Sequence, residues 1–234
     1  MTPAVLTESA GATPGIGRAC LLIARKDLVL EHRTREALLV TAPVGAVALW
    51  ITPMAVGTDI PLLRTLGPGM YWVVILLFGT LVMLRQSAVD PLAVSRMLDL
   101  AGIPGAVRLL GSALAGAVLL LGFEVILAPV AVLVYDPALT GWPWMLATLP
   151  AVAVGLALLG GIADALARPV GMRMTLGPLL SVPLALPLLL GATQTIQAAS
   201  IAKSPLPWLL LIVLVDLVLL LTALLVGRVL EESA

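Results

Sequence analysis

The sequence is poor in charge and in cysteine. Of its 234 residues, 11% are Asp, Glu, Lys or Arg and 61% are hydrophobic, with a mean hydropathy of +1.14. This composition is that of an integral membrane protein rather than a soluble domain. The formal net charge is zero, so no basic surface predicts a nucleic-acid partner. Cys20 is the only cysteine, which excludes an intrachain disulfide and any cysteine-based metal or cluster site within one chain.

Several motifs of catalysis and cofactor binding are also missing. Neither Lys26 nor Lys203 follows glycine, so the Gly-Lys-Ser/Thr ending of a phosphate-binding loop does not occur, and the chain cannot be its own ATPase. His32 is the only histidine, and in a charged segment a solvated histidine is far more common than a haem or metal ligand. A Ser-His-Asp set would have to use that same residue. We therefore expect a non-catalytic chain that binds no cofactor or metal itself.

Long apolar runs, in contrast, are abundant. A hydrocarbon core of about 30 Å requires roughly 20 apolar residues, and six segments qualify, at about 37–56, 69–84, 109–134, 145–163, 174–198 and 208–227. Residues 1–17 have no continuous apolar core, which predicts a disordered tail and not a signal peptide. The expected fold is an all-α integral membrane protein, with a single domain of six transmembrane helices over residues 18–234.

The distribution of charged residues predicts the orientation of the chain in the membrane, and the positions of the prolines predict how one span packs. With the N-terminus inside, the inner segments hold 11 of the 13 basic residues and the outer loops only Arg64 and Lys203, so the positive-inside rule predicts that both termini are cytoplasmic. The fifth segment contains Pro178, Pro183 and Pro187. Interior prolines remove backbone hydrogen bonds, so we expect this span to be buried in the bundle or in an interface, although proline is also ordinary in membrane helices.

Two predicted elements at the inner face have more charge or apolar surface than solvent requires. Residues 18–36 form an interfacial helix on which Leu21, Leu22, Leu28 and Val29 share one side. Its charged residues meet a second polar surface or simply solvent; they include Arg25, Lys26, Asp27, Glu31 and Arg35. Residues 91–101 form a short cytoplasmic helix, with Asp90 as its N-cap and Pro91 in its first turn. Its Leu98 and nearby Arg96 suit docking on a cytoplasmic protein.

A few polar side chains fall inside the predicted spans. Glu124 and Asp216 lie at a similar depth with no Lys or Arg in any span core, and Gln194 and Gln197 lie near the outer end of the fifth span. A charge at such a depth costs several kcal/mol. Two interpretations stay open: a hydrated cavity or subunit interface, or a protonated carboxyl that is hydrogen-bonded to a neighbouring helix.

Three stretches of the sequence resemble a known family. They are "ARKDLVLEHRTREALL" from Ala24, "LLRTLGPGMYWVVILL" from Leu62 and "RMTLGPLLSVPLALPLLLGATQ" from Arg173. The chain is similar over about residues 20–200 to haem exporter protein B, the membrane permease subunit of bacterial cytochrome c maturation. The resemblance implies an ABC-2-type permease in the bacterial inner membrane, which couples ATP hydrolysis to haem delivery or to release of a haem-loaded periplasmic chaperone.

The resemblance also implies partners. These are a cytoplasmic ATPase that binds ATP and Mg²⁺, a haem-handling membrane subunit that ligates haem, a small accessory membrane subunit, the periplasmic chaperone and, within the complex, a second copy of the chain. The helix 91–101 would be the coupling helix. Two alternatives are a generic ABC-2 exporter of lipid, drug or glycan, and a membrane scaffold subunit that transports nothing.

Overall fold

The computed structural model describes residues 16–34, 36–57, 59–89, 104–137, 141–167 and 173–232. This part of the chain forms seven helices: α1 (Ile16–Thr34), α2 (Glu36–Val56), α3 (Ile60–Val89), α5 (Gly105–Tyr135), α6 (Trp142–Ala167), α7 (Arg173–Ser200) and α8 (Leu206–Glu232). Every helix except α1 contains a stretch that is long and apolar enough to cross a membrane. The predicted all-α fold with six spans is therefore confirmed.

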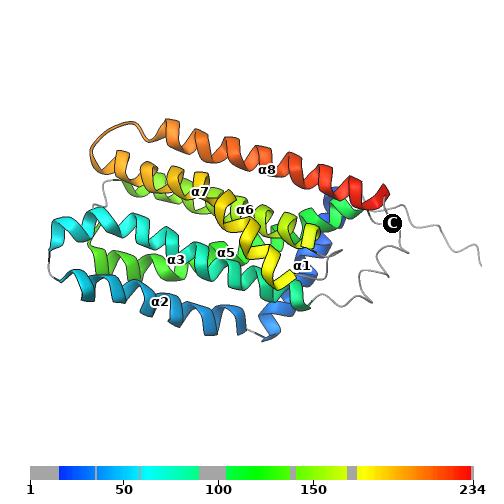
Figure 1. Cartoon of the computed structure of the whole chain (residues 1–234), viewed down its shortest axis with the longest axis horizontal. Helices are drawn as coiled ribbons and strands as arrows, with labels where there is room; N and C mark the ends of the chain where they lie inside the picture. Colours follow the sequence, from blue (N-terminus) through cyan, green and yellow to red (C-terminus); the bar gives the residue numbers. More distant parts are fainter. Residues whose placement is uncertain are drawn as a thin grey trace, which may run out of the picture.

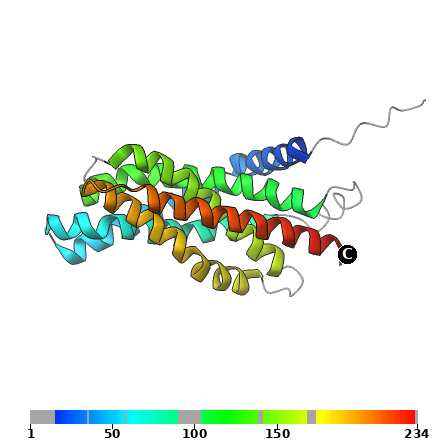
Figure 2. The ribbon, with the colours of Figure 1, turned by 90° about the horizontal axis from the view of Figure 1, so that it is seen from above.

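The six spans form one bundle with α2 and α8 at opposite edges (Figure 1). Helix α5 contacts α1, α2, α3, α6 and α8, and α6 contacts α3, α5, α7 and α8, so these two helices occupy the centre. The end of α2 and the start of α3, the end of α5 and the start of α6, and the end of α7 and the start of α8 lie together at what we call the far end. Helix α1 and the last turns of α8 lie at the opposite end, the α1 end (Figures 1 and 2).

The most buried span is α6, not the proline-rich fifth span. In α6, 56% of the apolar stretch is buried within the chain, compared with 39% in α7. Pro183 and Pro187 of α7 are exposed on the outside of the bundle. Helix α6 can be central because Gly155 lets neighbouring side chains reach its backbone: a Cβ there would lie 2.7 Å from a methyl group of Leu188 on α7.

Helix α3 begins at Ile60, earlier than the predicted start at residue 69. Asp59 caps its first turn, because the Asp59 carboxylate accepts a hydrogen bond from the Leu62 N–H at 3.1 Å. The Gly-Pro-Gly sequence at 67–69 resembles a turn, but the helix continues through it. Gly67 serves a close contact instead, since a Cβ at this position would lie 2.7 Å from Cβ of Tyr135 on α5.

The centre of the core is the seam between α3 and α5. Its fully buried large side chains are Trp72, Ile75, Leu120, Phe123, Leu127 and Tyr135. Two phenol groups bond to backbone oxygens across helices: the Tyr71 hydroxyl donates to the carbonyl of Glu124 at 2.8 Å, and the Tyr135 hydroxyl donates to the carbonyl of Leu49 at 2.9 Å. Because buried hydroxyl groups need partners, these two bonds fix α3, α5 and α2 relative to one another.

Candidate functional site

Helix α1 is fixed to the start of α5 through small residues. Ala24 is buried, and a Cβ added at Gly111 of α5 would lie 2.8 Å from Cβ of Ile23 and 3.1 Å from the backbone oxygen of Cys20. The Cys20 Sγ also donates to the backbone oxygen of Val107 at 3.5 Å. The two backbones therefore approach closely over a glycine, and a larger residue at 111 would separate the helices.

The opposite face of α1 points away from the bundle. Of the predicted apolar stripe, Leu21 is 62% exposed and Leu22 and Val29 are also exposed, whereas Leu28 is half-buried, so most of the stripe is left uncovered by the described residues. Arg25 is exposed on this same face, between the apolar side chains. The face thus combines bulky apolar groups with a cation, a composition typical of a helix at a membrane interface.

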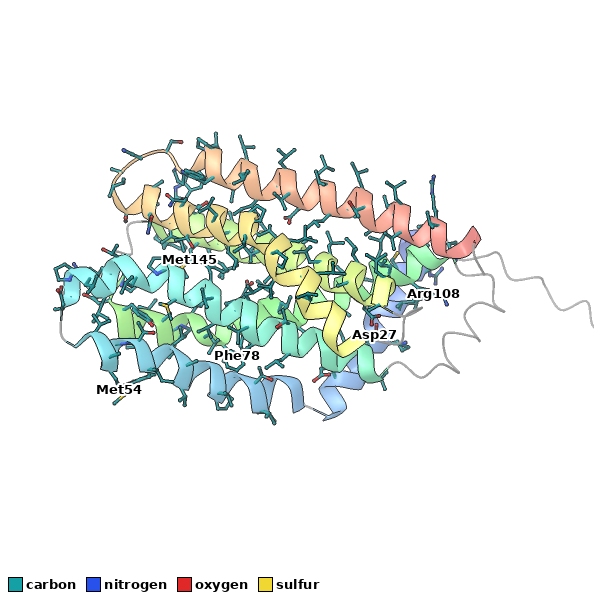
Figure 3. All side chains as sticks on the ribbon, viewed as in Figure 1. Asp27, Met54, Phe78, Arg108 and Met145 are labelled. Carbon is teal, nitrogen blue, oxygen red and sulfur yellow. The ribbon has the colours of Figure 1, made fainter. Side chains whose placement is uncertain are left out.

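The other predicted charged residues of α1 are only partly exposed. Nζ of Lys26 and Oδ1 of Asp27 form an ion pair at 3.0 Å, and the Asp27 side chain is the less accessible of the two. Figure 3 shows Asp27 and Arg108 at the α1 end, where α1 meets the beginning of α5. Glu31 is half-buried. Charge is therefore built into the junction between α1 and the bundle as well as onto its surface.

Four of the predicted inner-face positions receive no structural description. The segment 90–103, which contains Asp90, Arg96 and Leu98, lies outside the described residues, as does Arg35. Their role in docking stays a prediction.

Glu124 lies at the middle of α5 and is fully buried, with 0% of the residue exposed. Neither carboxyl oxygen has a hydrogen-bond partner among the described residues, and the same holds for the buried indole Nε1 of Trp72 on α3. The neighbouring Tyr71 hydroxyl bonds to the backbone of Glu124, not to its side chain. A carboxylate without a partner is expensive in such surroundings, so the side chain is suited to be neutral in this arrangement.

Asp216 occupies a different environment from Glu124. It lies on α8 against Gly155 of α6, where an added Cβ would collide with Oδ1 of Asp216, and that oxygen is buried without a hydrogen-bond partner in the part of the chain that the structure describes. Glu124, in contrast, has Tyr71 of α3 as its polar neighbour. The two carboxyls therefore contact different helices.

The amide cluster of α7 is only half-buried. Gln194 and Gln197 have intermediate exposure, whereas Thr195 is fully buried and donates to the backbone oxygen of Gly191 in its own helix at 2.7 Å. The threonine thus satisfies its hydroxyl locally.

A polar contact at the far end was not anticipated. Nε of Arg64 on α3 donates to the backbone oxygen of Asp136 at 2.9 Å, and its Nη2 pairs with the carboxylate of the same residue. Asp136 ends α5 in a left-handed conformation with φ of 44°, and its N–H bonds to the oxygen of Val132. The pair "DP" at 136–137 signals a helix end, but only the fold shows that Arg64 lies opposite.

Six apolar helices in one bundle, with a charged helix packed at one end, define a multi-pass membrane protein. The sequence model of the family described as CcmB protein matches residues 18–230. The chain therefore belongs to the CcmB family, the haem exporter protein B family, as the three sequence stretches predicted. This is a family of inner-membrane permease subunits of ABC systems for haem export and cytochrome c maturation. A comparison with curated proteins found no match.

Proposed function

We propose that this chain converts ATP hydrolysis by a separate cytoplasmic ATPase into haem delivery, or into release of a haem-loaded periplasmic chaperone, through a unit formed by α1 and α5. The observation that carries this proposal is the close contact of α1 with α5 at Gly111. Interiors so closely packed transmit displacement rather than absorb it. A movement imposed on α1 by an ATPase would therefore displace α5.

The other end of α5 makes the second half of this connection. The helix extends from Gly105 to Tyr135, and its cap residue Asp136 bonds to Arg64 at the start of α3. At about 1.5 Å per residue such a helix is roughly 45 Å long, enough to cross the bilayer. Displacement of α5 at the α1 end would thus also move its far end, where haem or its carrier would bind.

The charge distribution supports an inward-facing α1 end. Arg25, Lys26 and Arg108 lie there with Arg18 and Arg228, whereas Arg64 and Lys203 lie at the far end. The positive-inside rule then favours a cytoplasmic α1 end with both termini on that side. In this orientation the exposed face around Arg25 would lie where an ATPase and the inner leaflet meet.

The ATPase contact itself would involve two elements. The exposed side of α1 around Arg25 is one, and the segment 91–101 with Asp90, Arg96 and Leu98 is the other. Replacing Leu98 by Asp should detach the ATPase from the complex purified in mild detergent, while the chain stays in the membrane, because a charge would replace an apolar contact. Undiminished co-purification of the ATPase with this variant would contradict docking through this segment.

A membrane partner is expected on α7. Pro183 and Pro187 are exposed on the bundle surface, and each proline leaves the carbonyl oxygen four residues earlier without its usual amide donor. Unsatisfied backbone groups are costly in lipid. This favours coverage of the face by protein, either a second copy of the chain or the haem-handling subunit, with the small accessory subunit nearby. In this scheme the chain performs no covalent chemistry, the ATPase binds ATP and Mg²⁺, and haem is ligated by the haem-handling subunit.

The proposal is tested with Gly111→Leu in the complex reconstituted with the ATPase and the haem-loaded chaperone. The leucine would overlap Ile23 and push α1 away from α5, so we expect the ATPase to bind and hydrolyse ATP while chaperone release per ATP falls. Gly161→Ala is the control, because its Cβ would meet the side chains of Leu109 and Ala113 only at ordinary distances of 3.6 to 3.9 Å. Normal release per ATP in Gly111→Leu would refute coupling through α1 and α5 and would favour a scaffold role for this helix.

A further inference from the structure

An apolar pocket lies at the far end, among α3, α5, α6 and α7. Its volume is about 50 Å³, and its lining includes Tyr71, Ala131, Tyr135, Trp142, Met145 and Ile196. Figure 3 shows Met145 on α6 toward this end of the bundle. The pocket offers a ligand no free hydroxyl, because Tyr71 donates to the carbonyl of Glu124 and Tyr135 to that of Leu49. An occupant would therefore contact ring faces, methyl groups and the Met145 thioether.

The position of the pocket indicates where an occupant would come from. Most of the lining residues lie within two turns of the far end of their spans, with Tyr71 deeper in α3, and Trp142, at the first turn of α6, is 61% exposed. An exposed tryptophan at the end of a span is typical of the level where lipid headgroups meet the hydrocarbon. The pocket is thus at the height of the upper part of a phospholipid acyl chain.

The rim supplies a cation as well. Arg64 precedes the pocket residue Gly67 by one helical turn, and its side chain is 52% exposed. A guanidinium has five N–H donors, and Asp136 takes bonds from Nε and Nη2. Further donors are left at Nη1 and Nη2, and guanidinium binds phosphate well.

We propose that this pocket binds a phospholipid, with a segment of one acyl chain inside it and the phosphate at Arg64. An apolar cavity without polar partners stays dry and takes up hydrocarbon. In a bilayer the most abundant hydrocarbon is the acyl chain of a phospholipid. The volume limits the contact to a short part of the chain. Bound in this way, the lipid would stabilise the contact between α3 and α5, which the Arg64–Asp136 pair joins at the far end.

The test uses the full chain in nanodiscs containing a small fraction of phosphatidylglycerol with a diazirine in the upper part of one acyl chain. After irradiation, adducts are mapped by mass spectrometry. Adducts are expected on Tyr71 and Met145; Tyr71 is only 2% exposed, so bulk lipid does not reach it. Ala131→Leu should abolish these adducts by filling the pocket, while adducts on the exposed Leu214 of α8 persist.

Ala117→Leu is the matched control, since Ala117 is as buried as Ala131 on the same helix but does not line the pocket. It should retain the adducts on Tyr71 and Met145. Ile196→Phe fills the pocket from α7 and serves if Ala131→Leu does not yield folded protein. Two results would overturn the proposal. One is the absence of adducts on Tyr71 and Met145 in the unmodified chain, which is expected if a partner's side chain fills the pocket. The other is that the filling variants leave those adducts unchanged.

Discussion

Replacing Gly67 by alanine should destabilise the bundle, whereas the same change two residues later, at Gly69, should stabilise it. Both glycines lie inside α3, so alanine improves the helix propensity of each by about 1 kcal/mol. Their surroundings differ. A Cβ at 67 would lie 2.7 Å from Cβ and 2.9 Å from Cγ of Tyr135, but one at 69 would have nothing within 4 Å.

The size of the effect follows from this overlap. Tyr135 cannot easily move aside, because it is fully buried and its hydroxyl bonds to Leu49. Overpacking costs about 1–3 kcal/mol in general, and because Tyr135 is held in place the upper part of that range, about 2–3 kcal/mol, applies here. Subtracting the gain in propensity leaves Gly67→Ala less stable by about 1–2 kcal/mol, so that the two variants differ by about 2–3 kcal/mol.

The assay is thermal unfolding of the purified chain in mild detergent, followed by tryptophan fluorescence. For a chain of this size, 1 kcal/mol corresponds to about 2–4 °C in Tm, so the midpoints of the two variants should differ on the order of 5–10 °C, with the unmodified chain between them. A Gly67→Ala variant that melts at or above Gly69→Ala would refute the close contact between α3 and α5.

Three further predictions concern other parts of the chain. Alkaline phosphatase fused after Glu232 should be inactive and fused at Gly141 active, because the basic residues gather at the α1 end; an active fusion at Glu232 would mean that the orientation is wrong. Glu124→Gln should assemble normally, since an amide of the same shape brings no charge into the core, whereas Glu124→Lys should not; equal recovery of both in gel filtration would argue against the buried position. Burial raises the pKa of the Cys20 thiol, so its maleimide reaction should be slow at pH 7, should accelerate as pH rises, and should be faster in Gly111→Leu; a fast, variant-independent rate would show that α1 is not held on α5.

Hydropathy alone predicted the six spans, because each one is a long apolar run between polar connections. The start of α3 was missed because "GPG" at 67–69 has the composition of a turn, and only the packing of Tyr135 over Gly67 explains the glycine in a helix. The cap at Asp59 was present in the sequence and could have moved the boundary. The burial of α6 could not be predicted from hydropathy, since the most apolar span, α8, is the least buried: its mean hydropathy is 3.2 with 17% of the stretch buried, compared with 2.1 and 56% in α6.

The sequence predicted which residues belong to the candidate site, but not which of them contact one another. The sequence indicated the charged helix, and periodicity placed Leu21, Leu22, Leu28 and Val29 on one side of it. The fold leaves these side chains exposed except Leu28, which is half-buried. The contact of Cys20 with Val107 joins residues 87 positions apart, and no local pattern indicates it. Likewise, counting residues from the span ends predicted that Glu124 and Asp216 lie at one depth. Which helices they contact depends on the arrangement of the helices around α6, which the sequence does not indicate.

The central claim, that α1 and α5 move together to couple ATP hydrolysis to release, is tested most directly by a disulfide between them. Ile23→Cys and Gly111→Cys, in a Cys20→Ser background, place two Cβ atoms so close that a small shift permits the bond. In the complex reconstituted with the ATPase and the haem-loaded chaperone, release per ATP is measured before and after oxidation. Oxidation should leave release per ATP unchanged, because the bond joins two helices that already move as one. Loss of release on oxidation and its recovery on reduction would contradict the claim, since it would show that α1 must move against α5.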